Sequence, residues 1–390
     1  MLDDFNKKFP TTMDFNEFIA KTITKTKSIK PHSKNYSIVN DTEKYLDKLE
    51  DAFSTLSSLS KRKKLSSSGV EWFLDNYFVI QEAIELIRDD LPERYFNKLP
   101  SLDEDRHAPR IYHLARLMVS YYEVALVQND LDDFLYAYQA EVSLQMGEIW
   151  ALPLMLRLVL IETISATIYD LIEDKEGVQL ADPIDTSQIS PDEVIARSLR
   201  TLLLFDRIDW KEFFETHSKV EKVLREDPSG YYQKMDFDTR DNYRKKIEKL
   251  SDKSKKTEIQ VAKAAVRLAK EGTDKTQKRS HIGYFLIDDG EPEIKSAINY
   301  KEDLKGKLSD HFYKKNTAFY LGGIIFITLL VVSILAYFSQ FFMVEWWEIF
   351  LIALVSLIPA SSVAVNLVNS ILTAALPPKT LPKMDFRLSL

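Results

Sequence analysis

The chain has no cysteine among its 390 residues and only 10 glycines. The absence of cysteine excludes disulfide frameworks, zinc sites built on thiolates and cysteine nucleophiles. Scarce glycine argues against an all-β chain built on tight turns and favours long helices. The six histidines are scattered, and none stands in an H-E-x-x-H or comparable ligand spacing. At roughly 150 residues per domain, the length suggests two or three structural units.

Motifs for nucleotide, phosphate or acyl chemistry are also missing. The sequence contains no G-x-x-x-x-G-K-[ST], no G-x-G-x-x-G and no G-x-S-x-G. Two D-x-D triplets occur, at 130–132 and 236–238, and in nucleotide-sugar transferases such carboxylates hold a divalent cation. Both triplets lie beside expected helix starts, where aspartate is an ordinary cap. We therefore predict no catalytic, cofactor-binding or metal-binding residue within this chain.

Charge is absent from two long runs near the C-terminal end, 317–338 and 349–376. At 1.5 Å rise per residue, each run is long enough for a helix that crosses the ~30 Å hydrocarbon core of a bilayer. Trp346 and Trp347 lie between the runs, where aromatic residues anchor a turn at the membrane surface. Two helices buried in a soluble core are the alternative, which two adjacent uncharged runs of this length disfavour. We expect a transmembrane helix hairpin over 317–376.

Basic residues flank this hairpin and are absent from its connecting loop. Lys314 and Lys315 precede the first helix and Lys379 follows the second, whereas the loop carries acidic residues only. These lysines and the two tryptophans are the predicted membrane-interface anchors. By the positive-inside rule, both ends of the chain lie in the cytoplasm and the loop lies outside. We expect a multi-pass protein of the inner (cytoplasmic) membrane, with membrane lipid as a partner.

The rest of the chain is predicted to be mostly helical. Residues 1–40 are polar and weakly periodic, so we expect disorder or a short helix there. Apolar residues recur at helical spacing through 41–275, which predicts a helical cytoplasmic domain, and 276–316 form a juxtamembrane segment. Alternating apolar residues within 281–290 predict a short extended element. The expected fold class is all-α, a multi-helix cytoplasmic domain followed by a two-helix transmembrane hairpin.

One helix of this domain, over 149–169, is apolar nearly all round. Such a helix is central to a helical core. It is not expected to span the membrane, because Arg157 and Glu162 near its middle would each cost about 2.5–3.5 kcal/mol in the bilayer. With Glu148, they are predicted to be buried charges that orient helices through ion pairs, and a buried polar site is the functional alternative. Candidates for this pairing include Glu148 itself and the acids of the 71–90 helix.

The stretch 219–279 is rich in lysine and arginine. It could lie against anionic lipid, at ~1 kcal/mol for each basic residue close to the surface. Nucleic acid is the rival partner, but no aromatic-interleaved basic motif or known reading module accompanies the charge. A solvated helical face is the commonest role of such a stretch. We expect no nucleic acid among the partners.

Five strings carry a further signal. They are EWFLDNYFVIQEAIELIRDDLPERYFNKLP (71–100), GEIWALPLMLRLVLIE (147–162), DPSGYYQKMDFDTRDNYRKKIEKL (227–250), HIGYFLIDDG (281–290) and LPPKTLPKMDF (376–386). From about residue 70 to the end, their order resembles the N-terminal region of cyclic β-1,2-glucan synthases. No single string is a catalytic signature, but five in order are hard to obtain by chance.

The resemblance implies a place within a larger enzyme. Such synthases are large inner-membrane proteins, in which a glucosyltransferase module uses UDP-glucose to extend a protein-linked β-1,2-glucan. That module carries a metal-binding D-x-D and a Q-x-x-R-W motif, whereas this chain has no Arg-Trp dipeptide. By the resemblance, 377–390 are the truncated start of the glucosyltransferase module. UDP-glucose and a divalent cation are then implied for the missing module, and that downstream transferase module of the same polypeptide is a partner.

Two functions are therefore open. The first is the N-terminal, non-catalytic membrane-anchoring region of a cyclic β-1,2-glucan synthase, which would be inactive alone. The alternative is a stand-alone membrane-tethered helical scaffold or interaction protein. An independent enzyme is disfavoured by the missing motifs.

Overall fold

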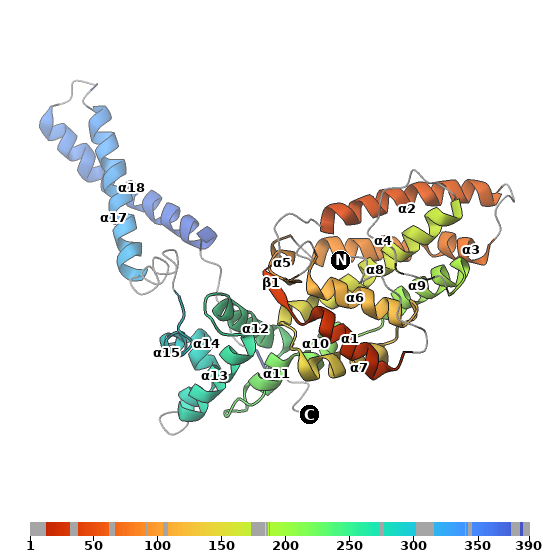
Figure 1. Ribbon diagram of the computed structural model, residues 1–390. Coiled ribbons are helices and arrows are strands. Elements are labelled where there is room, and N and C mark those ends of the chain that lie inside the picture. Colours follow the sequence, from red (N-terminus) through yellow and green to blue (C-terminus); the bar gives the residue numbers. More distant parts are fainter. Residues whose placement is uncertain are drawn as a thin grey trace. The chain divides into compact units, whose positions relative to one another are not determined.

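The computed structural model is helical almost throughout (Figure 1). It describes residues 13–31, 38–61, 67–90, 93–103, 108–172, 184, 186, 188–272, 277–301, 316–339, 341, 345–375 and 383–384. Apart from turns and loops, the main non-helical element among the described residues is a small two-stranded sheet. The chain is nearly all-α, as the sequence predicted.

The chain divides into two compact units, each with its own internal contacts. The first comprises Met1–Gly230 and Thr257–Ile282, and the second comprises Tyr231–Lys256 and Gly283–Leu390. The elements of the first unit are α1 (Phe15–Thr26), β1 (Ile29–Pro31), α2 (Ile38–Lys61), α3 (Ser68–Asp75), α4 (Tyr77–Asp90), α5 (Glu93–Phe96), β2 (Pro100–Leu102), α6 (Arg110–Tyr121), α7 (Gln128–Glu141), α8 (Met146–Ile172), α9 (Pro191–Phe205), α10 (Trp210–His217), α11 (Lys219–Leu224), α13 (Glu258–Gly272) and η3 (Gln277–Ser280). Those of the second unit are η2 (Tyr232–Lys234), α12 (Phe237–Asp252), α14 (Ile282–Ile287, which begins at the boundary), α15 (Glu291–Ala297), α17 (Asn316–Ser339) and α18 (Trp346–Ala375). The domain limits predicted from the sequence follow composition and hydropathy, whereas these two units follow contacts in space. Those predicted limits therefore stay predictions.

Helix α8 forms the centre of the first unit because it has no polar face. Helices α2, α4, α6 and α9 all pack against it. Its side chains at Leu152, Met155 and Val159 are fully buried. Each such side chain contributes roughly 1.5–3 kcal/mol relative to leaving it in water. The predicted central helix over 149–169 is confirmed, and its observed bounds are wider at both ends.

The N-terminal region contains a helix, which the sequence allowed, and a strand, which it did not predict. Helix α1 begins after Asp14, whose side chain accepts a hydrogen bond from the backbone N–H of Asn16 at 3.1 Å. The Phe18 ring of α1 is buried and stacks on Tyr121 of α6, with ring centroids 4.0 Å apart. Strand β1 then pairs antiparallel with β2. A strand of three residues is too short to show an alternating pattern in the sequence.

The extended element predicted for 281–290 is wrong, because this segment contains helix α14. Ile282, Phe285 and Leu286 are fully buried, and their spacing is that of one helical face. The alternation of Ile282, Tyr284 and Leu286 suggested a strand, but Tyr284 is only half-buried. Phe285 lies on the same buried face as Ile282 and Leu286, which is the pattern of a helix.

In the second unit, the chain beyond α18 returns to the start of α12. The backbone N–H of Asp236 donates to the carbonyl oxygen of Lys383 at 3.1 Å. In turn, the N–H of Lys383 donates to the Thr239 hydroxyl at 3.0 Å. Met235 and Met384 form an isolated antiparallel bridge beside these bonds. Residues before α17 and residues after α18 are therefore held together by hydrogen bonds of the Lys383 backbone.

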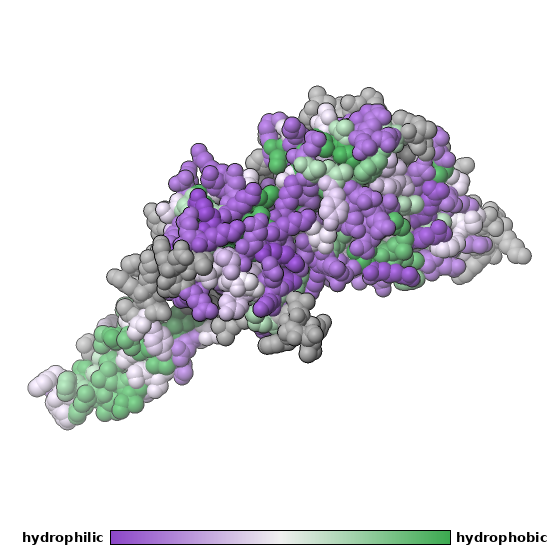
Figure 2. Space-filling view, turned by 90° about the horizontal axis from the view of Figure 1, so that it is seen from below, coloured by the Kyte–Doolittle hydropathy of each residue, from purple (hydrophilic) through white to green (hydrophobic). Residues whose placement is uncertain are grey.

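Three described helices are long and apolar enough to cross a membrane, namely α8, α17 and α18. They differ in burial within the protein, which is 89% for α8, 6% for α17 and 22% for α18 over their most apolar windows. Helices α17 and α18 pack against each other as an antiparallel pair. Figure 2 shows the hydrophobic surface of this pair at the left of the view. The sequence predicted two apolar helices in this region, and a third apolar helix, α8, lies inside the protein.

Candidate functional site

Three charged side chains of α8 are buried in the first unit. Glu148, Arg157 and Glu162 have 0%, 4% and 6% of their surface exposed. A buried charge without a partner costs several kcal/mol. The contacts of each side chain therefore determine what it can do.

Glu148, in the first turn of α8, forms a two-point ion pair with Arg110 at the start of α6. Arg110 donates from Nε to Oε1 at 2.8 Å and from Nη2 to Oε2 at 2.5 Å. The Oε2 atom also accepts the backbone N–H of Gln145 at 2.9 Å, just before the helix. Burial alone lowers the pKa of the Arg110 guanidinium, but the Glu148 carboxylate raises it, and the net pKa lies above its ordinary value. The Arg110 guanidinium therefore stays charged at neutral pH, and both oxygens of the Glu148 carboxylate accept hydrogen bonds.

Glu162, near the middle of α8, lies among hydroxyl groups from two other helices. The Tyr112 hydroxyl of α6 donates to its carboxylate at 2.9 and 3.1 Å, and the Tyr45 hydroxyl of α2 donates at 3.4 Å. Arg116 Nη1 lies 3.5 Å from Oε2. Burial lowers the pKa of Arg116, while Tyr112 and Glu162 raise it to a net value above the ordinary one. This network joins α2, α6 and α8.

Arg157 is paired with a residue that the sequence did not suggest. Its Nη2 donates to Asp206 Oδ1 at 2.9 Å, and its Nη1 donates to the carbonyl oxygen of Pro153 at 3.3 Å. The guanidinium also lies over the rings of Phe205 and Trp210. Glu148, a candidate partner for the buried charges, is bound to Arg110 instead. The ion pair of Arg157 is thus with Asp206 and not with a candidate acid of the 71–90 helix.

These contacts join helices, and the carboxylates of Glu148 and Glu162 accept hydrogen bonds on both of their oxygens. Arg110, Arg116 and Asp206 were missed by sequence reasoning. A signal existed for the first two, because they are the charged residues of α6, where every residue from Arg110 to Val119 is buried. No pattern marked Asp206, which follows the last residue of α9. The structural role of Glu148, Arg157 and Glu162 stays a prediction.

The predicted interface anchors are only partly within the described residues. Trp346 and Trp347 form the first turn of α18 and have 79% and 49% of their surface exposed. Exposed tryptophans at a helix end are typical of a membrane surface. Lys314, Lys315 and Lys379 lie outside the described residues.

The D-x-D triplets serve helix starts and one contact with a histidine. Asp130 accepts the N–H of Val127 at 2.9 Å in the first turn of α7, and Asp132 contacts His217. Asp236 caps α12 by accepting the N–H of Thr239 at 2.8 Å. Across the described ranges, no group of three or more histidine, aspartate or glutamate side chains is placed to hold a metal ion.

A serine, a histidine and an aspartate meet between α11 and α14. His281 Nδ1 lies 2.8 Å from Asp227 Oδ2 and 3.1 Å from the Ser229 hydroxyl, which itself donates to Asp227. In a catalytic triad, serine and aspartate contact opposite nitrogens of the ring, whereas here both contact Nδ1. Asp227 also accepts the N–H of Ile282 at 3.0 Å. Burial alone raises the pKa of Asp227, but its hydrogen bonds to His281 and Ser229 lower it to a net value below the ordinary one. These hydrogen bonds hold Asp227 and Ser229 against His281 and Ile282, as expected of a structural contact.

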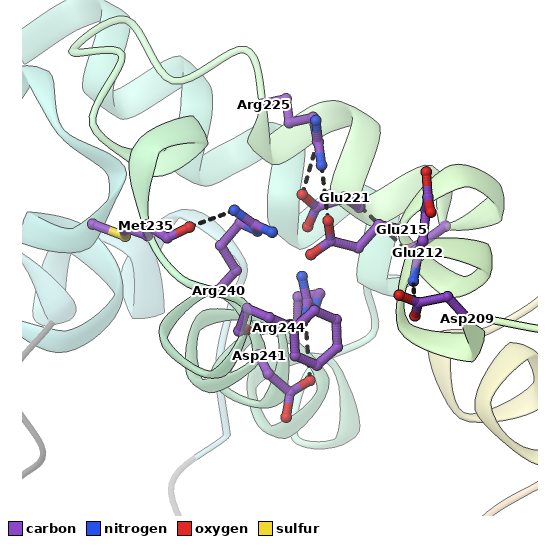
Figure 3. A network of polar contacts seen from close by, with 11 residues as sticks. Asp209, Glu212, Glu215, Glu221, Arg225, Met235, Arg240, Asp241 and Arg244 are labelled. Atoms are coloured by element: carbon purple, nitrogen blue, oxygen red, sulfur yellow. Dashed lines mark hydrogen bonds and ion pairs between the residues drawn. The ribbon is translucent and has the colours of Figure 1, made fainter. Parts of the chain in front are cut away.

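Figure 3 draws polar contacts of one arginine of the first unit and two arginines of the second unit. In the first unit, Arg225 of the α11 end contacts Glu221 at 2.9 Å and Glu215 at 3.0 Å. In the second unit, Arg240 donates to the carbonyl oxygen of Met235, and Arg244 lies over the Phe237 ring at 4.7 Å. These arginines are engaged within their own units, as expected of structural contacts.

His217, at the end of α10, gives a prediction for pH dependence. Its Nε2 lies 2.7 Å from Asp132 Oδ1, and its side chain is 1% exposed. Burial lowers the pKa of His217, and the hydrogen bond to Asp132 offsets this only in part. The folded chain thus binds this proton less readily than the unfolded chain, whose histidine pKa is about 6.5. The stability that His217 contributes is complete above that value and is lost as the pH falls through the folded pKa.

We expect the melting temperature of the detergent-solubilised chain to fall between pH 7.5 and pH 5.5. The fall should be smaller in His217→Gln, because glutamine does not titrate. Thermal unfolding followed by circular dichroism at both pH values measures this difference. An equal fall in the two proteins would contradict the assignment of the effect to His217.

Comparison with known proteins identifies a curated relative of this chain. The family models give no match to the chain. Among curated proteins, the chain is similar to the cyclic beta-(1,2)-glucan synthase NdvB of Rhizobium meliloti (strain 1021), with 24% identity over 393 aligned residues. The match covers 81% of this chain but 14% of the relative. The resemblance found in the five strings is confirmed, and the chain spans a small part of the protein that it resembles.

Proposed function

We propose that this chain is the N-terminal, non-catalytic, membrane-anchoring region of a cyclic β-1,2-glucan synthase. The similarity to NdvB across 81% of the chain is the observation that carries the proposal. In this proposal, a transferase module that follows in the same polypeptide uses UDP-glucose and a divalent cation. The present region anchors that module in the inner membrane and packs against it.

Helices α17 and α18 are the proposed transmembrane hairpin. Their apolar windows are mostly exposed, whereas that of α8 is 89% buried within the protein. An apolar surface of this extent is rare on soluble proteins and marks an interaction with lipid or another chain. Helix α8 is assigned to the soluble part, because its three buried charges are paired with residues outside the helix.

Two features support a topology with both ends in the cytoplasm. The described flanks of the hairpin carry Lys301 and Lys383, while the acids Glu345 and Glu348 mark the loop. The hydrogen bonds of Lys383 with Asp236 and with Thr239 join the chain before α17 to the chain after α18. Residues that contact each other lie on the same side of the membrane, so the chain between them must cross it an even number of times. The proposed hairpin supplies two crossings.

The contacts of the buried carboxylates support a non-catalytic role. A general acid or base must reach a proton on the substrate. Glu148 is fully buried and held by Arg110 and the N–H of Gln145, and Glu162 accepts hydrogen bonds from two tyrosines. Both carboxylates are buried, so neither is accessible to a substrate.

The test compares this chain with the same chain extended by its downstream coding region. Membranes that contain each protein are incubated with radiolabelled UDP-glucose, and β-1,2-glucan is measured. We expect glucan from the extended protein, and neither glucan nor UDP-glucose binding from the 390-residue chain. Binding or synthesis by the chain alone would contradict the non-catalytic role. A downstream region that encodes no transferase would favour the stand-alone scaffold.

A further inference from the structure

One exposed face of the mostly apolar helix α18 carries a row of four polar residues. Ser362, Asn366, Asn369 and Thr373 recur at spacings of 4, 3 and 4, and all four are exposed. At 100° per residue, they lie on one narrow stripe along the helix. We call these four residues the polar stripe.

The opposite face of α18 is already occupied by α17. Ser356, Ala360, Ala364 and Val368 are buried there. A Cβ atom on Gly323 of α17 would lie 3.7 Å from a Val368 methyl group, so the two helices pack closely at this point. Small residues allow such close packing between membrane helices. The hairpin itself therefore leaves the polar stripe exposed, although Asn369 still reaches the Tyr320 hydroxyl of α17.

The asparagines of the stripe have hydrogen-bonding groups that the described residues do not satisfy. No described residue bonds the Asn366 amide, whereas Asn369 accepts the Tyr320 hydroxyl at 3.2 Å and leaves its amide nitrogen unbonded. The hydroxyls of Ser362 and Thr373 donate to carbonyl groups of their own helix. Only the asparagines thus require an external partner.

The position of Asn366 makes lipid a poor neighbour for that amide. The contact between Gly323 and Val368 sets Asn366 beside the apolar span of α17, which runs from Tyr320 to Ser339. Lipid tails offer no hydrogen bonds, and asparagines inside a membrane bond across helices instead.

We propose that the polar stripe is the surface on which a second copy of this chain docks, with α18 against α18. This inference rests on the proposed function, because it requires that α17 and α18 cross the bilayer. Two copies inserted with the same topology have parallel α18 helices, so each stripe residue meets its counterpart near a two-fold axis. An amide both donates and accepts, so Asn366 is complementary to itself. The 4-3-4 spacing is that of a seam between two helices that cross at a shallow angle.

The natural absence of cysteine allows a direct crosslinking test. Ser362→Cys places a thiol on the stripe, and Ser361→Cys places one about 100° away on the same turn as a matched control. The full chain is reconstituted in liposomes and oxidised. We expect a disulfide-linked dimer of Ser362→Cys and little of the Ser361→Cys chain. Equal crosslinking of the two would overturn the inference.

A second measurement removes the hydrogen bonds without a thiol. Fluorescence energy transfer between labelled copies, measured over a range of lipid dilutions, gives the dimerisation constant. Asn366→Leu should weaken dimerisation by about 3- to 10-fold, and Asn366→Gln, which keeps the amide, should weaken it less. A chain that is monomeric at every dilution would overturn the inference and leave the stripe to a different helix or to the headgroup region.

Carbonate extraction of the same liposomes separates the two levels of the proposal. A chain that resists extraction but stays monomeric contradicts only the dimer. A chain that carbonate releases contradicts the membrane hairpin and therefore the proposed function as well.

Discussion

Replacing Glu148 by leucine is expected to lower the free energy of unfolding by about 3–5 kcal/mol. The change would leave Arg110, which is 1% exposed, as a buried charge without its carboxylate. It would also remove the acceptor of the Gln145 N–H at the start of α8. Denaturant unfolding of the detergent-solubilised chain, followed by tryptophan fluorescence, measures the loss.

The double variant Arg110→Met with Glu148→Leu should recover most of this loss, because no unpaired charge remains in the core. Glu17→Ala is the matched control, since it breaks the exposed ion pair with Lys21 and should change stability by at most about 0.5 kcal/mol. If Glu148→Leu unfolds at the same denaturant concentration as the parent chain, the structural interpretation of the buried charges is wrong.

Deleting Asn316–Ala375, the whole of α17 and α18, is expected to move the chain from the membrane to the soluble fraction. The shortened chain retains α8, the third apolar helix, which is enclosed by its own unit. Membranes from expressing cells are washed with alkaline carbonate, and the protein is measured in the pellet and the supernatant. The intact chain should stay in the pellet, and the shortened chain should be released nearly completely.

This experiment distinguishes α8 from the other two apolar helices. Size-exclusion chromatography of the released chain checks that it is folded and not aggregated. A shortened chain that still resists carbonate would show that α8, or another part of the first unit, is inserted in the bilayer.

The sequence predicted the main helices because their signals are local. The apolar run around α8 and the two uncharged runs near the end each identify a helix without reference to its neighbours. Two charges in the run around α8, Arg157 and Glu162, were enough to argue that it lies inside the protein. The same local reasoning failed at 281–290, where buried residues of a short helix also fit an alternating pattern.

The contacts of the buried charges could not be predicted from these patterns. Periodicity indicates which face of a helix is buried, but not which residue lies opposite. Arg157 was expected to pair with residues such as Glu148, yet it contacts Asp206, 49 positions along the chain and beyond the end of α9. Similarly, the three-residue strands β1 and β2 are too short to carry a signal, and their pairing is a long-range contact.

The central claim is that a membrane hairpin anchors this chain with both of its flanks in the cytoplasm. Single cysteines at Glu345, in the loop, and at Lys301, before the hairpin, test it in an otherwise cysteine-free chain. Spheroplasts that express each variant are treated with a membrane-impermeant maleimide. The account predicts labelling of Glu345→Cys in intact spheroplasts and labelling of Lys301→Cys only after permeabilisation. Labelling of Lys301→Cys in intact spheroplasts, or protection of Glu345→Cys there, would contradict it.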